Sequence, residues 1–557
     1  MYNLLIGGAA GQGVDTVTGV LERFIKHAGC GVYTMRDLMS RIRGGHNYSR
    51  LRFGQETPVS HTERLDGLIA LNEETLAIHL GDLQEEGFAI ADSAAKSDDP
   101  RLIKLDAAGI AKSLGNVRAS GSVAVGAALK LFGIPLYSDL AANIFRHLLR
   151  EDLVDLNVKA AMAGYEAVQQ KFPPLTGSHT EDMLLSGSQA LSLGALAAGL
   201  QFYAAYPMSP STSILEYLAQ SVKETGIAVE QAEDEIAAIN MAIGASFAGA
   251  RAMTGTSGGG FSLMVEALGL AGIAEIPLVV VNAQRPGPAT GLPTRTEQSD
   301  LKFVISAAQG EFPRMVIALR DHENAFNQTI RAFYLAEKYQ LPVILLTDQF
   351  LQDSTASVPL LDPYNIKVSE PENIPAKGEY ARYRYTDSGI SPRLFPGDPK
   401  GFASADSDEH DQFGRIIEDA QTRVKMMDKR MGKLELLKKE LKEPEHIGAK
   451  DPDILLLGWG SLSGPLKEAV SLLNKGEENR YAALVFGDVW PLPQGLLTRL
   501  AGKAKTLINV EQNYTGQLGS LIREQTGLTM NASILNYDGR QLSGAQIADR
   551  VKKEGPQ

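Results

Sequence analysis

The chain has 557 residues, of which 44% are hydrophobic and 22% charged, and its formal net charge is −12. This length suggests roughly three domains, and the acidic charge argues against a general nucleic-acid binder. The single cysteine, Cys30, excludes a disulfide framework and a cysteine-ligated iron–sulfur cluster within this chain. Because the sequence has no apolar run of membrane-spanning length and no signal-peptide pattern, we expect a cytoplasmic protein.

The first block, residues 1–172, alternates segments typical of strands and helices. A strand, a glycine loop and a helix are predicted within residues 2–28, two further strands at 67–72 and 86–93, and a buried helix at 120–134. This alternation predicts an α/β domain with a mostly parallel sheet and helices on both faces. A Pro-rich polar stretch ends the block.

Two further α/β blocks follow, at residues 178–365 and 450–557. Each contains buried apolar runs that end in loops, which predicts parallel strands with functional loops at their ends. In the second block these runs lie within 250–260, 276–288 and 341–350, and in the third within 453–461, 482–493 and 505–519.

Residues 366–449 are interpreted as a connector, made of a turn-rich segment and a charged helix. Six apolar residues are spaced three or four positions apart in this helix, which predicts one apolar stripe on an otherwise solvated helix. We expect the stripe to pack across the domains. Its residues are Ile417, Ala420, Val424, Met427, Met431 and Leu434.

A glycine loop follows the first strand and precedes a helix, with glycines at Gly7, Gly8, Gly11 and Gly13. Backbone N–H groups at such a helix start favour phosphate groups. The pattern differs from the GxGxxG dinucleotide fingerprint, and glycines that merely permit a tight turn and close helix packing are the alternative.

A loop rich in arginine lies in the same block and also contains His46, which is interpreted as an ordinary loop histidine. Arginine matches phosphate oxygens in bidentate fashion, although a solvated basic face is the alternative. Two elements suited to anions in one block favour a phosphorylated ligand. The arginines are Arg36, Arg41, Arg43, Arg50 and Arg52.

Four acids precede an apolar helix that begins near residue 235. Glu230, Glu233 and Asp234 are interpreted as favourable charges at the helix start, with Asp234 as a possible cap. Glu235 differs, because it directly precedes the apolar run and lies nine residues before Gly244, which opens a Gly- and Ala-rich segment.

The spacing from Glu235 to Gly244 resembles that of thiamine-diphosphate enzymes. In that family the glutamate hydrogen-bonds N1′ of the aminopyrimidine and promotes its imino tautomer, a role that suits an acid in apolar surroundings. The resemblance therefore makes Glu235 the catalytic and cofactor-binding acid, with Glu233 as the second choice.

Further segments narrow the resemblance to 2-oxoacid:ferredoxin oxidoreductases. "YPMSPST" (206–212) resembles their YPxTPS loop, residues 284–301 their substrate loop, and residues 407–434 their interdomain connector. The glycine loop and the RGG segment resemble the family's gamma domain. Together these motifs cover nearly the whole chain, which is similar to the fused gamma–alpha subunit, called subunit alpha, and is nearest to the 2-oxoglutarate type.

The resemblance implies four domains of an overall α/β fold. They are a CoA-associated gamma domain (1–172), a pyrimidine-binding domain (178–365), the connector with its charged helix (366–449) and a transketolase C-terminal-like domain (450–557). The segment 510–519 is interpreted as structural or partner-facing.

The resemblance also implies roles for individual residues. Ser209 replaces the usual threonine and keeps the hydroxyl that bonds substrate oxygens, while Arg285 grips the 2-oxoacid carboxylate. Thr294 shapes the substrate pocket and Arg295 meets a second carboxylate, which favours 2-oxoglutarate; a surface ion pair is the alternative for both arginines. Gly258 and Gly259 face the thiamine pyrimidine, or form a plain strand-end turn, and CoA phosphates bind Gly7, Gly8, Gly11, Gly13 and Arg43.

Two features of the family are missing from this chain. It has no GDG motif followed by an Asn ligand to Mg²⁺, and its single cysteine leaves no cluster-binding thiols. A beta subunit is therefore expected to supply the diphosphate and Mg²⁺ site and a [4Fe–4S] cluster, with thiamine diphosphate bound across the interface. No group of residues in this chain has metal-ligand spacing, and a dimer of alpha–beta pairs is expected.

The implied reaction converts a 2-oxoacid, CoA and two oxidised ferredoxins into acyl-CoA, CO₂ and two reduced ferredoxins. One alternative is a non-oxidative thiamine-diphosphate enzyme of the transketolase or decarboxylase type. Another is a non-catalytic CoA-binding scaffold. A Ser-His-Asp hydrolase is disfavoured because the GxSxG elbow is missing.

Overall fold

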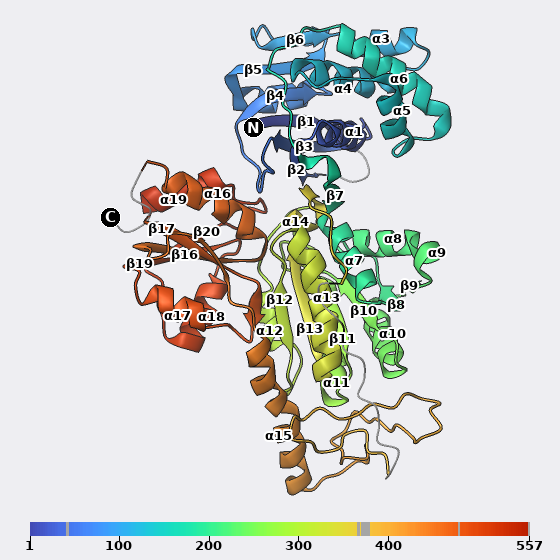
Figure 1. Ribbon diagram of the computed structural model, residues 1–557, viewed down its shortest axis with the longest axis vertical. Helices are drawn as coiled ribbons and strands as arrows, with labels where there is room; N and C mark the ends of the chain where they lie inside the picture. The colour runs from blue at the N-terminus through green and yellow to red at the C-terminus, as the bar shows by residue number, and fades with distance from the viewer. Residues whose placement is uncertain (40–43, 365–367, 369–378, 477–479, 555–557) are drawn as a thin grey trace. The chain divides into compact units, whose positions relative to one another are not determined.

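The computed structural model describes all residues except 40–43, 365–367, 369–378, 477–479 and 555–557 (Figure 1). Its contacts divide the chain into two compact units, which are described separately. Unit 1 comprises Met1–Ser186, Asp353–Leu360 and Ser543–Ala545, and unit 2 comprises Gly187–Gln352, Leu361–Leu542 and Gln546–Gln557.

Unit 1 is built on an eight-stranded sheet in the order β6-β5-β4-β1-β3-β2-β14-β7. Neighbours from β6 to β1 run parallel, and all other neighbours run antiparallel. The strands are β1 (Tyr2–Ala10), β2 (Gly31–Asp37), β3 (Gly44–Gly54), β4 (Leu65–Ala70), β5 (Leu83–Asp92), β6 (Leu102–Leu105), β7 (Met183–Ser186) and β14 (Thr355–Val358).

The expectation of a mostly parallel sheet in the first block was wrong for half of this sheet. Only residues 38–43 separate β2 from β3, which is too short a connection for the crossover that parallel pairing requires, and the two strands pair antiparallel. Strands β7 and β14 join the sheet from beyond residue 172, so the domain limits stay a prediction. The predicted strands at 67–72 and 86–93 are confirmed as β4 and β5.

The helices of unit 1 cover both faces of its sheet. Strand β1 sends Leu4 and Ile6 into the core beneath α1 and α4, and Leu5 into a smaller core with Leu76 of α2, as the two-residue period of a strand requires. The predicted buried helix at 120–134 is confirmed as α4. The helices are α1 (Val14–His27), α2 (Glu73–His79), α3 (Ala107–Ser113), α4 (Ser120–Leu131), α5 (Ser138–Arg146) and α6 (Glu151–Glu166).

Unit 2 contains a seven-stranded sheet in the order β18-β12-β13-β11-β10-β8-β9, parallel except at β18. The central strands β11 and β13 are buried along their whole length, as expected of a parallel sheet covered on both faces. The strands are β8 (Phe202–Ala205), β9 (Ala228–Gln231), β10 (Ala252–Thr256), β11 (Leu278–Gln284), β12 (Met315–Ala318), β13 (Pro342–Asp348) and β18 (Asp488–Trp490).

Helices α7 and α13 pack together beside this sheet, and α10 packs against α11 (Figure 1). The strand-to-loop transitions predicted within 250–260, 276–288 and 341–350 are confirmed as the ends of β10, β11 and β13. The helices are α7 (Gly187–Ala197), α8 (Thr212–Gln220), α9 (Val222–Thr225), α10 (Glu235–Phe247), α11 (Gly258–Ile273), α12 (Leu301–Ser306), α13 (His322–Tyr339) and α14 (Gln349–Asp353).

A five-stranded sheet, in the order β15-β17-β16-β19-β20, forms the C-terminal part of unit 2. It is parallel except at β15. The apolar residues of one of its faces share a core with the seven-stranded sheet, and those of the other face form a core of their own. Its elements are β15 (Glu445–Gly448), β16 (Ile454–Trp459), β17 (Tyr481–Phe486), β19 (Thr506–Glu511), β20 (Ala532–Leu535), α16 (Ser463–Leu473), α17 (Gly495–Ala501), α18 (Gln517–Thr526) and α19 (Gly544–Glu554).

The connector helix α15 (Ala420–Leu437) does not bury the apolar stripe predicted for it. None of the six stripe residues is buried, and Val424 is 58% exposed. The buried positions are instead Met426, Lys429, Arg430, Lys433 and Leu437. The stripe prediction was wrong because three buried cations of this helix pair with acids outside it, Lys429 and Lys433 with Glu275 and Arg430 with Glu409.

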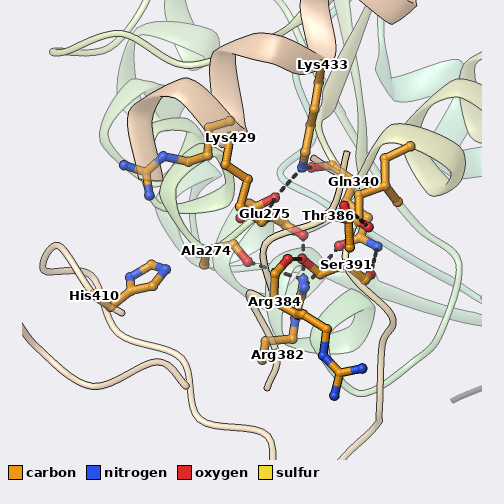
Figure 2. Close-up of polar contacts among 12 residues, drawn as sticks. Ala274, Glu275, Gln340, Arg382, Arg384, Thr386, Ser391, His410, Lys429 and Lys433 are labelled. Atoms are coloured by element: carbon orange, nitrogen blue, oxygen red, sulfur yellow. Dashed lines mark hydrogen bonds and ion pairs between the residues drawn. The ribbon is translucent and has the colours of Figure 1, made fainter. Parts of the chain in front are cut away.

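Glu275, which follows α11, is the centre of this charge cluster (Figure 2). Its carboxylate accepts hydrogen bonds from Lys429 at 2.6 and 2.8 Å and contacts Lys433. Its main-chain carbonyl accepts a bond of 2.7 Å from Arg382, which also donates to Gln340 at 2.9 Å. The connector is thus attached to the seven-stranded sheet domain by buried ion pairs.

Among the described residues, no helix combines the length and the apolar character needed to cross a membrane.

Candidate functional site

Glu235 is the first residue of α10 and is only 3% exposed. Asp234 is the N-cap of this helix, and its carboxylate accepts a hydrogen bond of 2.7 Å from the Ala237 N–H, so the predicted capping role is confirmed. Glu230 and Glu233 are exposed. Among the four acids, therefore, Glu235 is the one whose side chain lies inside the protein.

One oxygen of the buried Glu235 carboxylate, Oε1, has no hydrogen-bond partner among the described residues. A buried acceptor left unpaired costs about 1–3 kcal/mol, so this atom fits a donor supplied by a ligand. The oxygen lies against the first turn of α11, because a Cβ added at Gly260 would be 2.4 Å from it and 2.1 Å from Thr256 Oγ1. Glycine at position 260 thus leaves room beside the acid.

The YPMSP loop lies between this acid and the predicted substrate arginine. Thr256 Oγ1 approaches Met208 Sδ at 3.8 Å, and Arg285 donates a hydrogen bond of 2.8 Å to the carbonyl of Ser209, the next residue in the loop. The structure therefore gathers Glu235, Ser209 and Arg285 at the ends of β8, β10 and β11.

Arg285 is half-buried, and burial lowers the pKa of its guanidinium. Among the ion pairs of the described residues, none involves Arg285. A guanidinium held by a neutral carbonyl has unused donors and an uncompensated charge, which suits a carboxylate ligand.

The C-terminal domain holds the second half of the substrate loop through its backbone. Gln298 N–H donates to the Gln512 carbonyl at 2.8 Å, and the Asn513 side chain donates to the Gln298 carbonyl at 3.0 Å. Gln517 bonds the Ser299 carbonyl at 2.6 Å and accepts from the Lys302 N–H at 2.9 Å. The segment 510–519 thus has a structural role, which is to fix this loop.

Thr294 and Arg295 lie in the same loop, just before Gln298. The stem of Arg295 packs against Gly539 of the C-terminal domain, since a Cβ added at Gly539 would be 3.1 Å from Arg295 Cβ. Thr294 is half-buried. Their contact with a substrate stays a prediction.

Polar residues at the end of β11 belong to the same site but were not selected from the sequence. Asn282 and Gln284 are fully buried in an otherwise apolar strand, and both contact Asp300 at the end of the substrate loop. The sequence signal that could have identified them is the presence of two amides within the apolar run "VVVNAQ". Buried polar groups require hydrogen-bond partners, so amides in a buried strand indicate a polar site.

The outward faces of α10 and α11 carry exposed apolar side chains beside a few polar ones, which are Asn240, Ser262 and Glu266. Ile236, Met241 and Leu263 are between 42% and 49% exposed, and Gly244 has open space where a Cβ would stand. Large apolar side chains that are exposed close together often mark a surface where a protein contacts a partner. These faces therefore suit another polypeptide.

In unit 1, the glycine loop forms one wall of a cavity of 480 Å³. Gly11 and Gly13 have φ values of 92° and 84°, which other residues rarely adopt. Gln12 holds the turn, since its amide oxygen accepts from the Ala9 N–H at 2.7 Å and from Asn72 at 2.9 Å. The cavity is lined by Ala9, Ala10, Gly11, Gly13, Val14, Asp15, Thr16, Leu38 and Asn47.

Gly7 and Gly8 have a packing role in the same loop. A Cβ at Gly7 would be 2.5 Å from the methyl group of Thr75, and one at Gly8 would be 3.0 Å from Gln12 Oε1. The alternative interpretation of these two glycines, close packing, is therefore sufficient to explain them.

The arginine-rich segment is mostly the strand β3 and not the loop expected from the sequence. Arg36 pairs with Glu22 at 3.0 Å, Arg50 donates to the Thr62 and Glu63 carbonyls, and Arg52 donates to the Ser60 carbonyl. These three arginines hold the fold together. Arg41 and Arg43 lie outside the described residues.

His46, interpreted from the sequence as an ordinary loop histidine, lies in β3 and contacts a second histidine. Its Nε2 is 2.9 Å from Nε2 of His79, whose Nδ1 is 2.9 Å from an Asp82 oxygen. Burial lowers the pKa of both imidazoles, so the pair is neutral over a wider pH range than free histidine.

Two family models match the sequence. One, described as pyruvate flavodoxin/ferredoxin oxidoreductase, thiamine diP-bdg, matches residues 193–429, and the other, described as pyruvate ferredoxin/flavodoxin oxidoreductase, matches residues 3–167.

Curated relatives and a solved structure extend the match to the full chain. The 2-oxoacid:ferredoxin oxidoreductase subunit alpha of Saccharolobus solfataricus is 32% identical over 98% of this chain and 97% of its own length. The 2-oxoglutarate synthase subunit KorA of Methanocaldococcus jannaschii is 35% identical over 60% of this chain and 89% of its own. The structure of 2-oxoglutarate:ferredoxin oxidoreductase from Magnetococcus marinus, with 2-oxoglutarate, coenzyme A and succinyl-CoA bound, superposes with a TM-score of 0.92 at 29% identity, covering 99% of both chains.

Proposed function

Because this chain belongs to the family of 2-oxoacid:ferredoxin oxidoreductase alpha subunits, we propose that Glu235, Ser209 and Arg285 form its share of the active site. The observation that carries this proposal is the unpaired, buried Oε1 of Glu235 beside the glycine turn of α11. The residues present fit the pyrimidine of thiamine diphosphate, because a buried carboxylate beside an open glycine turn suits a flat ring with a hydrogen-bond donor.

When bound, thiamine diphosphate supplies the carbon nucleophile and the electron sink for decarboxylation. Glu235 would hydrogen-bond N1′ of the pyrimidine through its unpaired Oε1 and move a proton at that atom. Gly258 and Gly259, in the turn at the start of α11, would face the pyrimidine side of the cofactor. Further cofactor contacts are proposed for a second chain.

The 2-oxoacid is bound by the loop that follows β11. Arg285 pairs with its 1-carboxylate and is fixed in place by the Ser209 carbonyl, while the Ser209 hydroxyl bonds substrate oxygens. We propose 2-oxoglutarate as the substrate, with Arg295 at its distal carboxylate and Thr294 in the pocket wall. The KorA relatives are named 2-oxoglutarate synthases, and the related Magnetococcus marinus structure contains 2-oxoglutarate.

We propose that coenzyme A binds the glycine loop of unit 1. The left-handed backbone of Gly11 and Gly13 at the start of α1 and the adjoining cavity of 480 Å³ support this assignment. Gly7 and Gly8 shape the loop, and Arg43 is the proposed cationic contact. The overall reaction is then 2-oxoglutarate, CoA and two oxidised ferredoxins giving succinyl-CoA, CO₂, a proton and two reduced ferredoxins.

The exposed apolar side chains Ile236, Met241 and Leu263 on α10 and α11 support a partner chain beside the thiamine site. We propose a beta subunit that carries the diphosphate and Mg²⁺ site and a [4Fe–4S] cluster, in a dimer of alpha–beta pairs that reduces ferredoxin. The four domain limits given above, 1–172, 178–365, 366–449 and 450–557, are part of this proposal.

The test is an anaerobic assay of the complex with its beta subunit. Viologen reduction would be followed with CoA and, in turn, 2-oxoglutarate, pyruvate, branched-chain and aryl 2-oxoacids. CoA-dependent reduction with 2-oxoglutarate supports the proposal and gives Arg295 its role, whereas reduction with another acid alone reassigns the substrate. No reduction with any acid, from a complex shown to contain thiamine diphosphate and clusters, overturns it.

A further inference from the structure

Asp300 closes the substrate loop at its base. Its N–H donates a hydrogen bond of 2.9 Å to Oε1 of Gln284, the residue that directly precedes Arg285. Gln284 is fully buried and also donates to the Thr347 carbonyl at 3.1 Å. The two ends of the loop are therefore bonded to each other and to the neighbouring strand β13.

The carboxylate of Asp300 faces the glycine turn at the start of α11 (residues 258–260), which is called the thiamine turn below. It accepts a hydrogen bond of 3.2 Å from Asn282, and a Cβ added at Gly258 would be 2.4 Å from its Oδ2. Two positions further along the same turn, a Cβ at Gly260 would be 2.4 Å from Glu235 Oε1. The glycine turn thus lies between Asp300 and Glu235.

Asp300 does not cap its own helix. It is the N-cap residue of α12, but its side chain makes no capping hydrogen bond there. Ser257, the N-cap residue of α11, makes none either, and its buried hydroxyl has no partner among the described residues. A carboxylate at the N-terminus of the 16-residue helix α11 is favoured by the helix dipole. The Asp300 side chain is therefore directed at the turn of another helix.

We propose that Asp300 is a positioning residue that couples the substrate loop to the thiamine turn. It fixes Gly258 in contact with the base of the loop, and it thereby sets the distance between the turn and Glu235. The inference rests on the proposed function. Coupling between binding sites is reciprocal. Disturbing the contact between Asp300 and Gly258 therefore weakens the binding of both the 2-oxoacid and thiamine diphosphate.

The contact between Asp300 and Gly258 makes a specific prediction for paired substitutions. Gly258→Ala places a methyl group against the Asp300 carboxylate, and overpacking of this kind is expected to weaken thiamine diphosphate binding by about tenfold. Asp300→Ala removes the three atoms nearest to that methyl group. The double variant is therefore expected to bind the cofactor as tightly as Asp300→Ala alone.

Two further variants complete the set: one separates the shape of the Asp300 side chain from its charge, and the other is a control. Asp300→Asn keeps the shape of the side chain, so it should not relieve Gly258→Ala. Gly269→Ala is the control within the same helix, because Gly269 lies outside the proposed cofactor site and the nearest atom to its added Cβ is 3.7 Å away. It should leave the cofactor affinity unchanged within about twofold.

The experiment measures the thiamine diphosphate Kd of the alpha–beta complex by calorimetry, together with KM for 2-oxoglutarate and kcat. Asp300→Ala should raise both the Kd and the KM while kcat at saturation stays close to that of the unsubstituted complex. Cofactor binding by the unsubstituted complex tests the proposed function, and the comparison of variants tests the role of Asp300. Additive effects of Gly258→Ala and Asp300→Ala overturn the inference, as does a loss of kcat with unchanged Kd and KM, and both results leave the function standing.

Discussion

The Arg285 guanidinium donates a hydrogen bond of 2.8 Å to the Ser209 carbonyl, which joins the loop after β11 to the YPMSP loop after β8. A neutral carbonyl orients the guanidinium without cancelling its charge. The fork of Arg285 therefore remains available for the carboxylate that we propose as its ligand, and the contact brings the two loops together at this proposed subsite.

Replacing Arg285 by lysine should raise KM for the 2-oxoacid by at least about tenfold, because a charge-assisted bond contributes about 1.5–3 kcal/mol. Lysine keeps the charge but loses the planar fork and its bond to Ser209. Steady-state kinetics of the complex would measure the change. Arg150→Lys is a matched control, since the Arg150 side chain is 78% exposed. Equal KM values for Arg285→Lys and the unsubstituted complex would contradict the subsite.

Glu235→Gln should abolish turnover while the complex still assembles. Glutamine keeps the size of the side chain but does not exchange a proton, which general acid–base catalysis requires and which contributes about 10²–10⁴-fold. The control is Glu233→Gln, because Glu233 is exposed in the same segment and should keep full activity. Viologen reduction and size-exclusion chromatography check the two parts of the prediction. Full activity in Glu235→Gln with loss in Glu233→Gln would reverse the assignment.

Helices and strands could be predicted from the sequence where the pattern of apolar and polar residues within one segment determines its secondary structure. The strand ends at β10, β11, β13 and β16 followed from buried apolar runs, and Asp234 was identifiable as a cap from its place before an apolar helix. The β2–β3 hairpin was missed because arginines alternating with other residues in β3 were interpreted as a ligand-binding loop.

The connector helix shows why the remainder was not predictable. Glu275 and Lys429 are 154 positions apart in sequence, so the periodicity of the helix contains no sign that its charged face is the buried one. The site has the same character. Glu235 was assigned from its spacing to Gly244 and the family resemblance. The contacts of Asp300 with Gly258 and of Gln512 with Gln298 are tertiary contacts that no motif reveals.

Glu275 and Lys433 should respond very differently to substitution. Burial raises the pKa of Glu275, but Lys433 and Lys429 outweigh it and hold this pKa below its ordinary value. Glu275→Gln leaves two buried lysines without a counter-charge and should destabilise the protein by about 3–5 kcal/mol.

Lys433→Met is the matched comparison in the same cluster. Burial lowers the pKa of Lys433 to about 7 against the attraction of Glu275, so its charge is costly to bury. Its removal leaves the Glu275–Lys429 pair intact and should change stability by no more than about 1 kcal/mol. Urea unfolding would measure both variants, and a loss in Lys433→Met as large as that in Glu275→Gln would contradict this account of the cluster.

Asp348, at the end of β13, should make stability depend on pH between about 4 and 6. It is 1% exposed and accepts hydrogen bonds from Ser461 at 2.5 Å and from the Leu351 N–H at 3.0 Å. Burial nevertheless raises the pKa of its carboxyl from 3.8 to about 6. The folded state thus holds this proton more tightly than the unfolded state. Its stabilising contribution is complete below pH 3.8 and is lost as pH rises through 6.

Asp348→Asn removes this titration. The stability of the unsubstituted protein relative to the variant should therefore fall by about 3 kcal/mol between pH 4 and 7, as measured by urea unfolding at steps across that range. Ser461→Ala provides the internal check, because the Ser461 hydroxyl is the first of the hydrogen bonds that hold the Asp348 pKa down. Without that donor, the loss of stability should move to higher pH. A pH-independent difference between the unsubstituted protein and Asp348→Asn would show that this carboxyl keeps its ordinary pKa despite its burial.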